Sequence, residues 1–355
     1  MSNFLPGRGQ KWIILAAIAG LFAGCSASSP GGENSAATET ETLPKVVATH
    51  SVLCDLAQQI AKETIDLTCL LQGGANPHAY EPTPRDRQAI ENAQLVLYNG
   101  YNLETRLVNI VESTSTPSLK IAVSEVAVPE PLMGEGHSHG EEHSHEEEHS
   151  HEEEHSHEEE HSHEEEQAEK LQPDPHVWHD AQNGIEMVEV IENNLVEIVP
   201  DRAVEYQQNA EEVKAELAQI DDWIESQIAT IPSKSRKLIT THDAFGYYAR
   251  AYNIPIEGAL KGLSTEQKPS ASRLKELIEF VKTSSVPTIF VESTVNPKLM
   301  ETVAEEADVK LSERQLYADG LGDEGSEGET YQEMLLANTQ AIVEGLDGQF
   351  TPFGN

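Results

Sequence analysis

Basic residues are scarce in this chain. Lysine and arginine together number 23 against 62 aspartate and glutamate residues, which gives a formal net charge of −39. Proteins that bind nucleic acid present a basic surface to the phosphates, and anionic membrane surfaces attract basic segments in the same way. The composition therefore excludes nucleic-acid binding and docking on an anionic membrane through the protein surface. An acidic surface instead concentrates small cations near the protein.

Long apolar runs are absent except for one near the start. Arg8 and Lys11 precede the run "WIILAAIAGLFAGC", which is too short to span a bilayer and is typical of a secretory signal. Small residues directly before Cys25 resemble a bacterial lipobox, in which Cys25 becomes the lipidated first residue. The alternative is simple cleavage and release. Residues 26–43, rich in Ser, Gly, Thr and Glu, indicate a flexible tether.

Cysteine is also rare, and apart from Cys25 the chain contains only Cys54 and Cys69. The pattern predicts a strand, a helix that contains Cys54, and a second strand that contains Cys69. In a parallel β-α-β unit the start of the helix and the end of the second strand lie at the same edge of the sheet. An exported protein can join such a pair as a disulfide. Two unpaired buried cysteines are the other reading, and the sequence does not decide between them.

The rest of the chain alternates short apolar strands with amphipathic helices, which predicts an α/β fold with parallel sheets. The expected strands are "KVVATH", "IDLTCLL", "LVLYNG" and "KIAVS" in a first lobe, and "KLITTH", "IPIEGAL", "TIFVES" and "VKLSER" in a second. The chain of 355 residues is long enough for about two domains, which agrees with two similar lobes.

A long helix is expected between the lobes, over residues 202–230. Its apolar positions recur every three or four residues along a single face, and at 1.5 Å per residue it would reach roughly 43 Å. Such a helix can act as a rigid strut. The expected divisions are a signal peptide at 1–24, a tether at 25–44, an N-terminal lobe at 45–200, a linking helix at 201–232 and a C-terminal lobe at 233–355.

A low-complexity insert interrupts the N-terminal lobe at residues 135–169. It contains five HSH units among glutamates and has no apolar residue between His137 and Glu166, so we expect it to be disordered. Neutral imidazoles there can bind metal weakly, because a flexible segment loses chain entropy when it binds. The alternative is a solvated acidic linker that binds zinc only incidentally. The histidines concerned are His137, His139, His143, His145, His149, His151, His155, His157, His161 and His163.

The five other histidines, His50, His78, His176, His179 and His242, lie in loops or at the ends of expected strands. Ligand sites in open parallel sheets form beyond the carboxyl ends of the strands, and these positions fall at that edge in both lobes. Neutral imidazole suits zinc, and carboxylate oxygens suit harder ions such as manganese. Three histidines with one carboxylate make a four-ligand zinc shell. Asp319, which follows a strand-like stretch and precedes glycines, is the candidate carboxylate.

Four motifs carry a family resemblance. "GANPHAYEPTPRD", "DPHVWHD", "TTHDAFGYYARAYNI" and "ADGLGDEGSEGETYQEM" resemble the metal-binding lipoproteins of zinc and manganese ABC importers (cluster A-I, zinc-importer type). The resemblance covers residues 46–345 except the insert. It implies two α/β lobes joined by a single long helix, with the metal in the cleft between them.

The resemblance also implies the ligands, which fall on His78, His176, His242 and Asp319. The sequence departs from the family pattern at His179, where Leu is usual, and at His50, which is not usually histidine. Each of the two is an extra ligand, a support for the ligands, or without a role. Zinc-importing members often carry a histidine-rich insert in this position, which favours Zn²⁺ over Mn²⁺ as the transported ion. The implied protein is an exported, lipid-anchored monomer that delivers zinc to an ABC permease, with metal exchange through modest movement of the C-terminal lobe or of the loop at Asp319.

Two other functions are compatible with a zinc-binding cluster. Three histidines around zinc with an open fourth position would suit a hydrolase, but outside the insert the chain has neither an HExxH motif nor a G-x-S-x-G motif. A carboxylate that completes the shell would also close the open position. A surface adhesin or a metal buffer is the third reading. We therefore expect a binding protein rather than an enzyme.

Overall fold

The computed structural model describes residues 42–136 and 170–354. Its N-terminal half contains one parallel sheet with the strand order β2-β1-β3-β4, in which Val46 lies between Leu67 and Leu95. These strands are β1 (Lys45–Ala48), β2 (Asp66–Cys69), β3 (Leu95–Tyr98) and β4 (Leu119–Ala122). The helices α1 (Ser51–Ala61), α2 (Pro84–Asn92), α3 (Thr105–Ser113) and α4 (Val123–Ala127) alternate with them.

The sequence analysis did not predict the antiparallel pair that flanks the insert. Strands β5 (Met133–Gly136) and β6 (Lys170–Pro173) pair in four register positions, from Met133 with Pro173 to Gly136 with Lys170. The strands are short and contain glycine and proline, and their pairing joins positions far apart in sequence. Neither local propensity nor alternation therefore indicated them.

The C-terminal half has two pairs of parallel strands. Strand β7 (Leu238–His242) pairs with β8 (Ile256–Lys261), and β9 (Thr288–Ile289) pairs with β10 (Lys310–Leu311). A hydrogen bond of 2.9 Å from Phe290 N to Ile239 O links the β9 segment to β7. The helices of this half are α7 (Gly246–Ala251), α8 (Ala271–Thr283), α9 (Lys298–Ala307) and α10 (Tyr331–Gly345).

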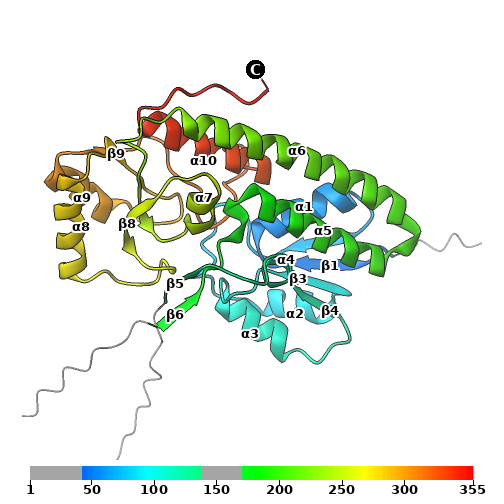
Figure 1. Cartoon of the computed structure of the whole chain (residues 1–355). Coiled ribbons are helices and arrows are strands. Elements are labelled where there is room, and N and C mark those ends of the chain that lie inside the picture. Colours follow the sequence, from blue (N-terminus) through cyan, green and yellow to red (C-terminus); the bar gives the residue numbers. More distant parts are fainter. Residues whose placement is uncertain (1–41, 137–169, 355) are drawn as a thin grey trace, which may run out of the picture. The chain divides into compact units, whose positions relative to one another are not determined.

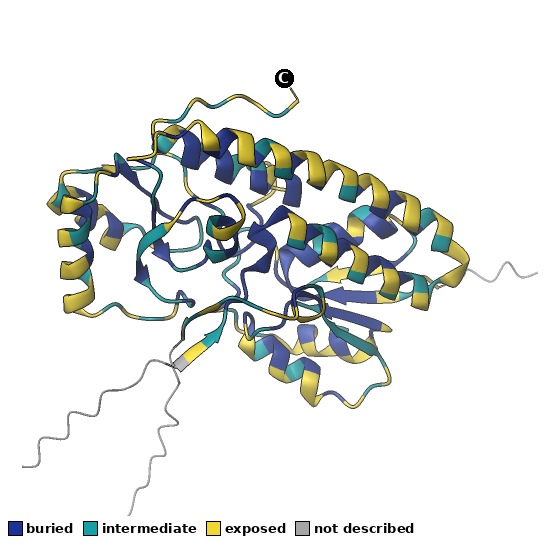
Figure 2. Ribbon diagram, in the orientation of Figure 1, coloured by how far each residue is buried: buried dark blue, intermediate teal, exposed yellow. Residues whose placement is uncertain are grey.

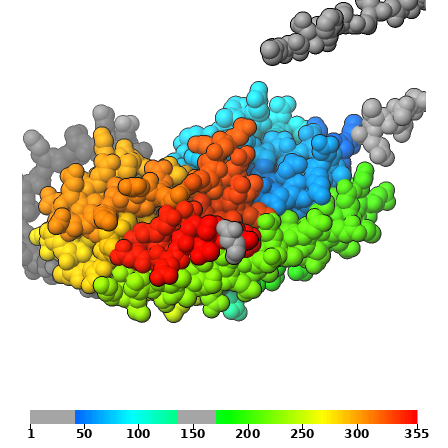
Figure 3. All heavy atoms as spheres, turned by 90° about the horizontal axis from the view of Figure 1, so that it is seen from above, coloured from blue at the N-terminus to red at the C-terminus, as the bar shows by residue number. Residues whose placement is uncertain are grey.

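Helix α6 (Ala203–Ala229) lies along both halves, as the expected strut does (Figures 1 and 3). Its predicted apolar face is buried, from Tyr206 through Leu217 to Ile228, and Figure 2 shows the buried stripe opposite an exposed one. These side chains belong to a core cluster that includes residues of β1, α1 and α10. The architecture is therefore α/β with two parallel-sheet regions joined by one long helix.

Two short elements precede α6. The 3₁₀ turn η1 (Val177–His179) leads directly into α5 (Ala181–Ile198), and η2 (Pro200–Arg202) joins α5 to α6. Asp180 caps α5, because its side chain accepts a hydrogen bond from Gln182 N at 3.0 Å. This cap fixes the end of the η1 turn.

The two mature cysteines are joined in the structure. Cys54 in α1 and Cys69 at the end of β2 form a disulfide across a Cα–Cα distance of 5.6 Å. The register places Cys69 beside Ala48, three residues before the start of α1. The bridge therefore ties the second strand to the first helix at the carboxyl edge of the sheet, as the β-α-β argument allows. Within the described residues, no helix is long and apolar enough to cross a membrane.

Candidate metal centre

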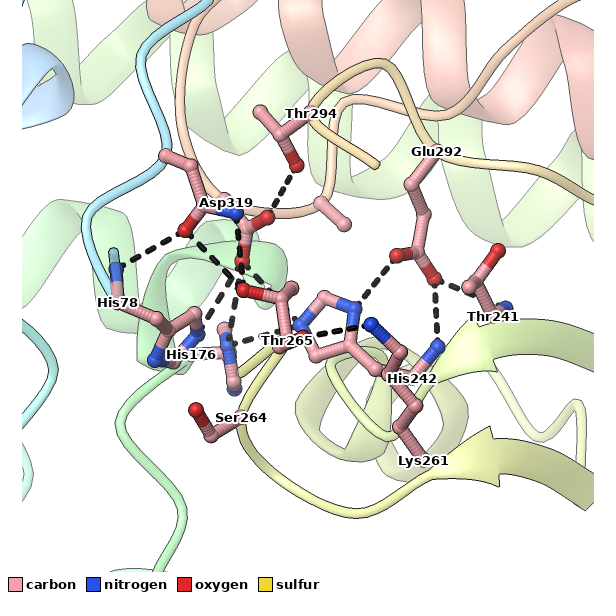
Figure 4. Close-up of polar contacts among 12 residues, drawn as sticks. His78, His176, Thr241, His242, Lys261, Ser264, Thr265, Glu292, Thr294 and Asp319 are labelled. Atoms are coloured by element: carbon pink, nitrogen blue, oxygen red, sulfur yellow. Dashed lines mark hydrogen bonds and ion pairs between the residues drawn. The ribbon is translucent and has the colours of Figure 1, made fainter. Parts of the chain in front are cut away.

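Four side chains from four separate segments converge at one point (Figure 4). His78 lies in the loop between β2 and α2, His176 directly before η1, His242 at the end of β7 and Asp319 between β10 and α10. One potential ligand atom from each lies within 4.8 Å of all the others. Asp319 Oδ1 is 3.3 Å from His78 Nε2, 3.2 Å from His242 Nε2 and 3.9 Å from His176 Nε2. The sequence-predicted ligand set is thus brought together as one group.

Burial leaves this group short of hydrogen-bond partners. The side chains of His176 and His242 are fully buried, and His78 and Asp319 are only 8% and 1% exposed. His78 Nε2 and Asp319 Oδ1 make no hydrogen bond within the described residues. Buried polar atoms without partners are costly, and two of them facing each other across 3.3 Å fit a shared cation. A cation at the centre of the group would satisfy both.

Carboxylates behind two of the histidines fix the orientation of their rings. Asp174 Oδ1 lies 2.8 Å from His176 Nδ1 and also accepts from His176 N at 3.0 Å. Glu292 Oε2 lies 2.5 Å from His242 Nδ1, and Glu292 Oε1 accepts from the backbone N–H groups of Thr241 and His242 at 3.0 and 2.9 Å. A ring that donates from Nδ1 presents the lone pair of Nε2 to the centre, which is the tautomer that binds a metal.

Sequence analysis missed both supporting carboxylates. Glu292 is the penultimate residue of the expected strand "TIFVES", and the position of an acidic residue near a strand end could have indicated it. Thr294 was missed as well, although its hydroxyl donates to Asp319 Oδ2. That bond occupies one carboxylate oxygen and leaves Oδ1 to face the three imidazoles.

Charges within the group are unevenly distributed in the metal-free chain. Burial on its own would lower the pKa of His242, but Glu292 and Asp319 outweigh it and raise the pKa well above its ordinary value. Burial would raise the pKa of Asp319, yet His242 and His78 hold it well below the ordinary carboxyl value. Burial lowers the pKa of His176 strongly and raises that of Asp174 to about 7. The positive form of His242 and the negative form of Asp319 therefore stabilise each other.

His50 and His179 lie beside the group but outside it. Their Nε2 atoms are each 2.8 Å from a backbone carbonyl, of Asp319 and of Ala318 respectively. Both side chains are buried. Of the alternatives left open by the sequence, the geometry favours support over ligation, because Nε2 of each ring already has a backbone carbonyl as its partner.

Other predicted positions fall outside the described residues. These are the lipidation candidate Cys25 and the ten insert histidines, His137 to His163. The structure places only the two points, Gly136 and Lys170, where the described chain leaves and re-enters around the insert.

Comparison with known proteins gives consistent matches. The family described as "Zinc-uptake complex component A periplasmic" matches residues 46–345. The manganese-binding lipoprotein MntA of Halalkalibacterium halodurans is 31% identical over 333 residues, which cover 94% of this chain and 97% of that protein. The metal ABC transporter substrate-binding lipoprotein SsaB of Streptococcus sanguinis is 30% identical over 340 residues, with the same coverage of 94% and 97%.

A solved structure agrees with these matches. The periplasmic zinc-binding protein TroA of Treponema pallidum is similar with a TM-score of 0.72 and 29% identity, covering 86% of this chain and 99% of that chain. The names of these relatives include both manganese and zinc.

Proposed function

The chain belongs to the family of periplasmic zinc-uptake complex A components, the substrate-binding proteins of metal ABC importers, and on that premise we propose that its own substrate is Zn²⁺. It captures the ion outside the cytoplasmic membrane and delivers it to the permease of the importer. The family is a binding component of transport and not an enzyme family.

The observation that carries the choice of metal is the donor set. His78, His176 and His242 offer three imidazole nitrogens, and Asp319 offers one oxygen, all within 4.8 Å of one another. Four donors of this kind match the tetrahedral shell of zinc, for which imidazole is a favoured ligand. Thr294 occupies the second oxygen of Asp319, which disfavours the extra oxygen ligand that a harder ion with a larger shell would take. Manganese, the ion named for several relatives, is the alternative.

Lipid anchoring at Cys25 completes the proposal. The relatives that match over nearly their whole length are lipoproteins by name, and the apolar run before Cys25 has the sequence pattern of a lipoprotein signal. A receptor anchored at the outer face of the membrane remains close to its permease. We expect a monomer that interacts with that permease.

Metal exchange needs a change at the centre, because three of its four side chains are almost completely buried. We propose that the loop at Asp319 or the C-terminal half moves modestly, since α6 packs along both halves and resists wide bending. Acid should release the metal, because protons compete with it for the imidazole nitrogens.

A competitive titration with Zn²⁺ and Mn²⁺ tests this function. The soluble chain from residue 26 is compared with the same chain lacking residues 137–166 and with His242→Ala. We expect one tight zinc site that survives the deletion, weaker sites that vanish with it, and a loss of tight binding by orders of magnitude in His242→Ala. Tight binding that disappears with the insert would contradict the assignment of the site. A preference for manganese at the surviving site would contradict the choice of metal.

A further inference from the structure

His50 and His179, the two departures from the family pattern, make the same unusual contact. Each directs Nε2 at a backbone carbonyl of the metal-binding loop: His50 contacts Asp319 O and His179 contacts Ala318 O, both at 2.8 Å. The two carbonyls are consecutive along the chain. His50 follows β1 and His179 lies in η1, so both contacts run from the N-terminal half to a loop of the C-terminal half.

A carbonyl oxygen can only accept, so each imidazole must carry its proton on Nε2. The Nδ1 atoms of both rings are buried and have no hydrogen-bond partner within the described residues. Burial lowers the pKa of His50 to about 4 and that of His179 to about 3. Both rings are therefore neutral donors at neutral pH, with Nε2 committed to the loop rather than to a metal.

Aromatic contacts hold the two rings in place. The His50 ring lies 4.6 Å from the Trp178 ring, and the His179 ring is stacked on Phe245 with centroids 4.4 Å apart and planes 27° apart. Trp178 also lies 5.5 Å from the His179 ring. Packed rings lose few rotamers when they donate, so their hydrogen bonds fix the position of the loop at little entropic cost.

Two further hydrogen bonds hold the same loop segment, residues 318–322. Leu321 N donates to Ser51 Oγ at 3.0 Å, and Gly74 N donates to Leu321 O at 2.8 Å. A Cβ added to Gly320 would lie 2.6 Å from Ser51 Oγ and 3.1 Å from His50 Nε2. The segment that carries Asp319 thus belongs to the C-terminal half by sequence and is bonded to the N-terminal half by its backbone.

The η1 turn links the metal ligand His176 to the hydrogen-bond donor His179, so the positions of the two side chains depend on each other. His176 precedes η1 and His179 ends it, and His179 N contacts His176 O at 3.4 Å. The short turn therefore positions one metal ligand directly and a second one, Asp319, through its backbone.

We propose that His50 and His179 are positioning residues that hold Asp319 against the three imidazoles and so slow the escape of the metal. This inference rests on the proposed function. In this role His50 and His179 affect the metal only through the position of Asp319, which they hold by donating hydrogen bonds from Nε2.

A double-mutant cycle on the rate of Zn²⁺ dissociation tests the proposal, with the full mature chain and a colorimetric chelator as the acceptor. His50→Ala and His179→Ala should each accelerate dissociation about 5- to 50-fold, the range for one lost hydrogen bond that leaves a buried acceptor unpaired. In an Asp319→Ala background the same changes should alter the rate less than about twofold, because coupling vanishes when the shared partner is gone.

Conservative variants separate positioning from general structure. Gln at position 50 or 179 keeps an N–H donor at a similar reach, so His50→Gln and His179→Gln should return the rate most of the way to wild type. Equal acceleration with and without Asp319, or glutamine variants as fast as the alanine variants, would overturn the proposal. If an alanine variant does not fold, as judged by circular dichroism, the glutamine variant alone decides.

Other results would refute the proposed function itself. A wild-type chain that binds no zinc tightly, or an Asp319→Ala variant as slow as wild type, would refute the zinc centre itself. If wild type retains Mn²⁺ instead, the same cycle with Mn²⁺ tests the positioning roles, since they concern the carboxylate and not the identity of the ion.

Discussion

Glu292→Gln is the substitution for which the structure makes the sharpest prediction. Glu292 is fully buried and accepts three hydrogen bonds, one from His242 Nδ1 at 2.5 Å and two from the backbone N–H groups of Thr241 and His242. Glutamine has nearly the same shape. Its carbonyl oxygen can keep the two backbone bonds only if its NH₂ group faces His242 Nδ1.

That arrangement forces His242 into the wrong tautomer. Facing an N–H donor, Nδ1 must accept, so the ring proton moves to Nε2, the atom 3.2 Å from Asp319 Oδ1. A metal must then displace that proton while two N–H groups oppose each other. Loss of such a supporting carboxylate typically weakens metal binding about 10- to 100-fold, which corresponds to about 1.4 to 2.8 kcal/mol.

Competition with a chelator of known affinity measures the zinc dissociation constant of wild type and variant. Glu192→Gln is the matched control, because Glu192 is a buried carboxylate on α5 that contacts Lys214 instead of the centre. Calorimetry in two buffers of different protonation enthalpy adds a second readout. Wild type should release about one proton from His242 on binding zinc at neutral pH, and the variant should release less.

The reasoning would be refuted by a Glu292→Gln variant that matches the Glu192→Gln control in affinity and releases as many protons as wild type. Unfolding of the metal-free variants by heat checks that both are folded. A variant that binds weakly because it is unfolded would be detected there and would not count as support.

Three further predictions concern stability and the loop. In the metal-free chain, His50 and His179 have pKa values of about 4 and about 3, below the unfolded value of about 6.5. The unfolded state therefore binds more protons, and the unfolding free energy contributed by each ring should fall by about 3 kcal/mol between pH 6.5 and pH 4. Denaturant titrations at several pH values measure this fall in wild type and in the variant with both His50→Gln and His179→Gln. A variant whose unfolding free energy falls with pH as steeply as that of wild type would contradict the prediction. Gly320→Ala should weaken zinc binding more than Gly325→Ala. Both glycines have positive φ, but only a Cβ at position 320 would lie against Ser51 Oγ. Equal zinc affinities in the two variants would argue against the close approach of Gly320 to Ser51. Replacing Cys54 and Cys69 by serine should lower the unfolding free energy by about 3 kcal/mol, the loop-closure value for a separation of 15 residues, and an unchanged denaturation midpoint would show that the bridge does not constrain the unfolded chain.

Sequence patterns predicted those parts of the fold that depend on local periodicity. The buried face of α6 follows directly from the spacing of its apolar residues. The convergence of His78 and Asp319 required the strand-end rule together with the family motifs, because the two residues lie far apart along the chain.

Contacts that depend on the direction of a side chain could not be predicted. Glu292 and Thr294 read as ordinary residues after a strand, and only the fold turns them toward His242 and Asp319. The roles of His50 and His179 depend on which ring nitrogen faces the loop, and no spacing rule determines that. Sequence alone therefore placed these two histidines near the site and left their function open.

The antiparallel pair β5–β6 fixes the two ends of the insert and so affects how far the length of the insert can vary. Four register pairs hold Met133–Gly136 against Lys170–Pro173, so the chain that connects them joins two points already fixed side by side. The entropy of closing a connecting chain grows only with the logarithm of its length, and a doubling costs about 0.6 kcal/mol. A connection with more or fewer HSHEEE units can therefore join the same paired ends at little cost in closure entropy. Natural isolates should differ in repeat number while the four ligand positions stay unchanged.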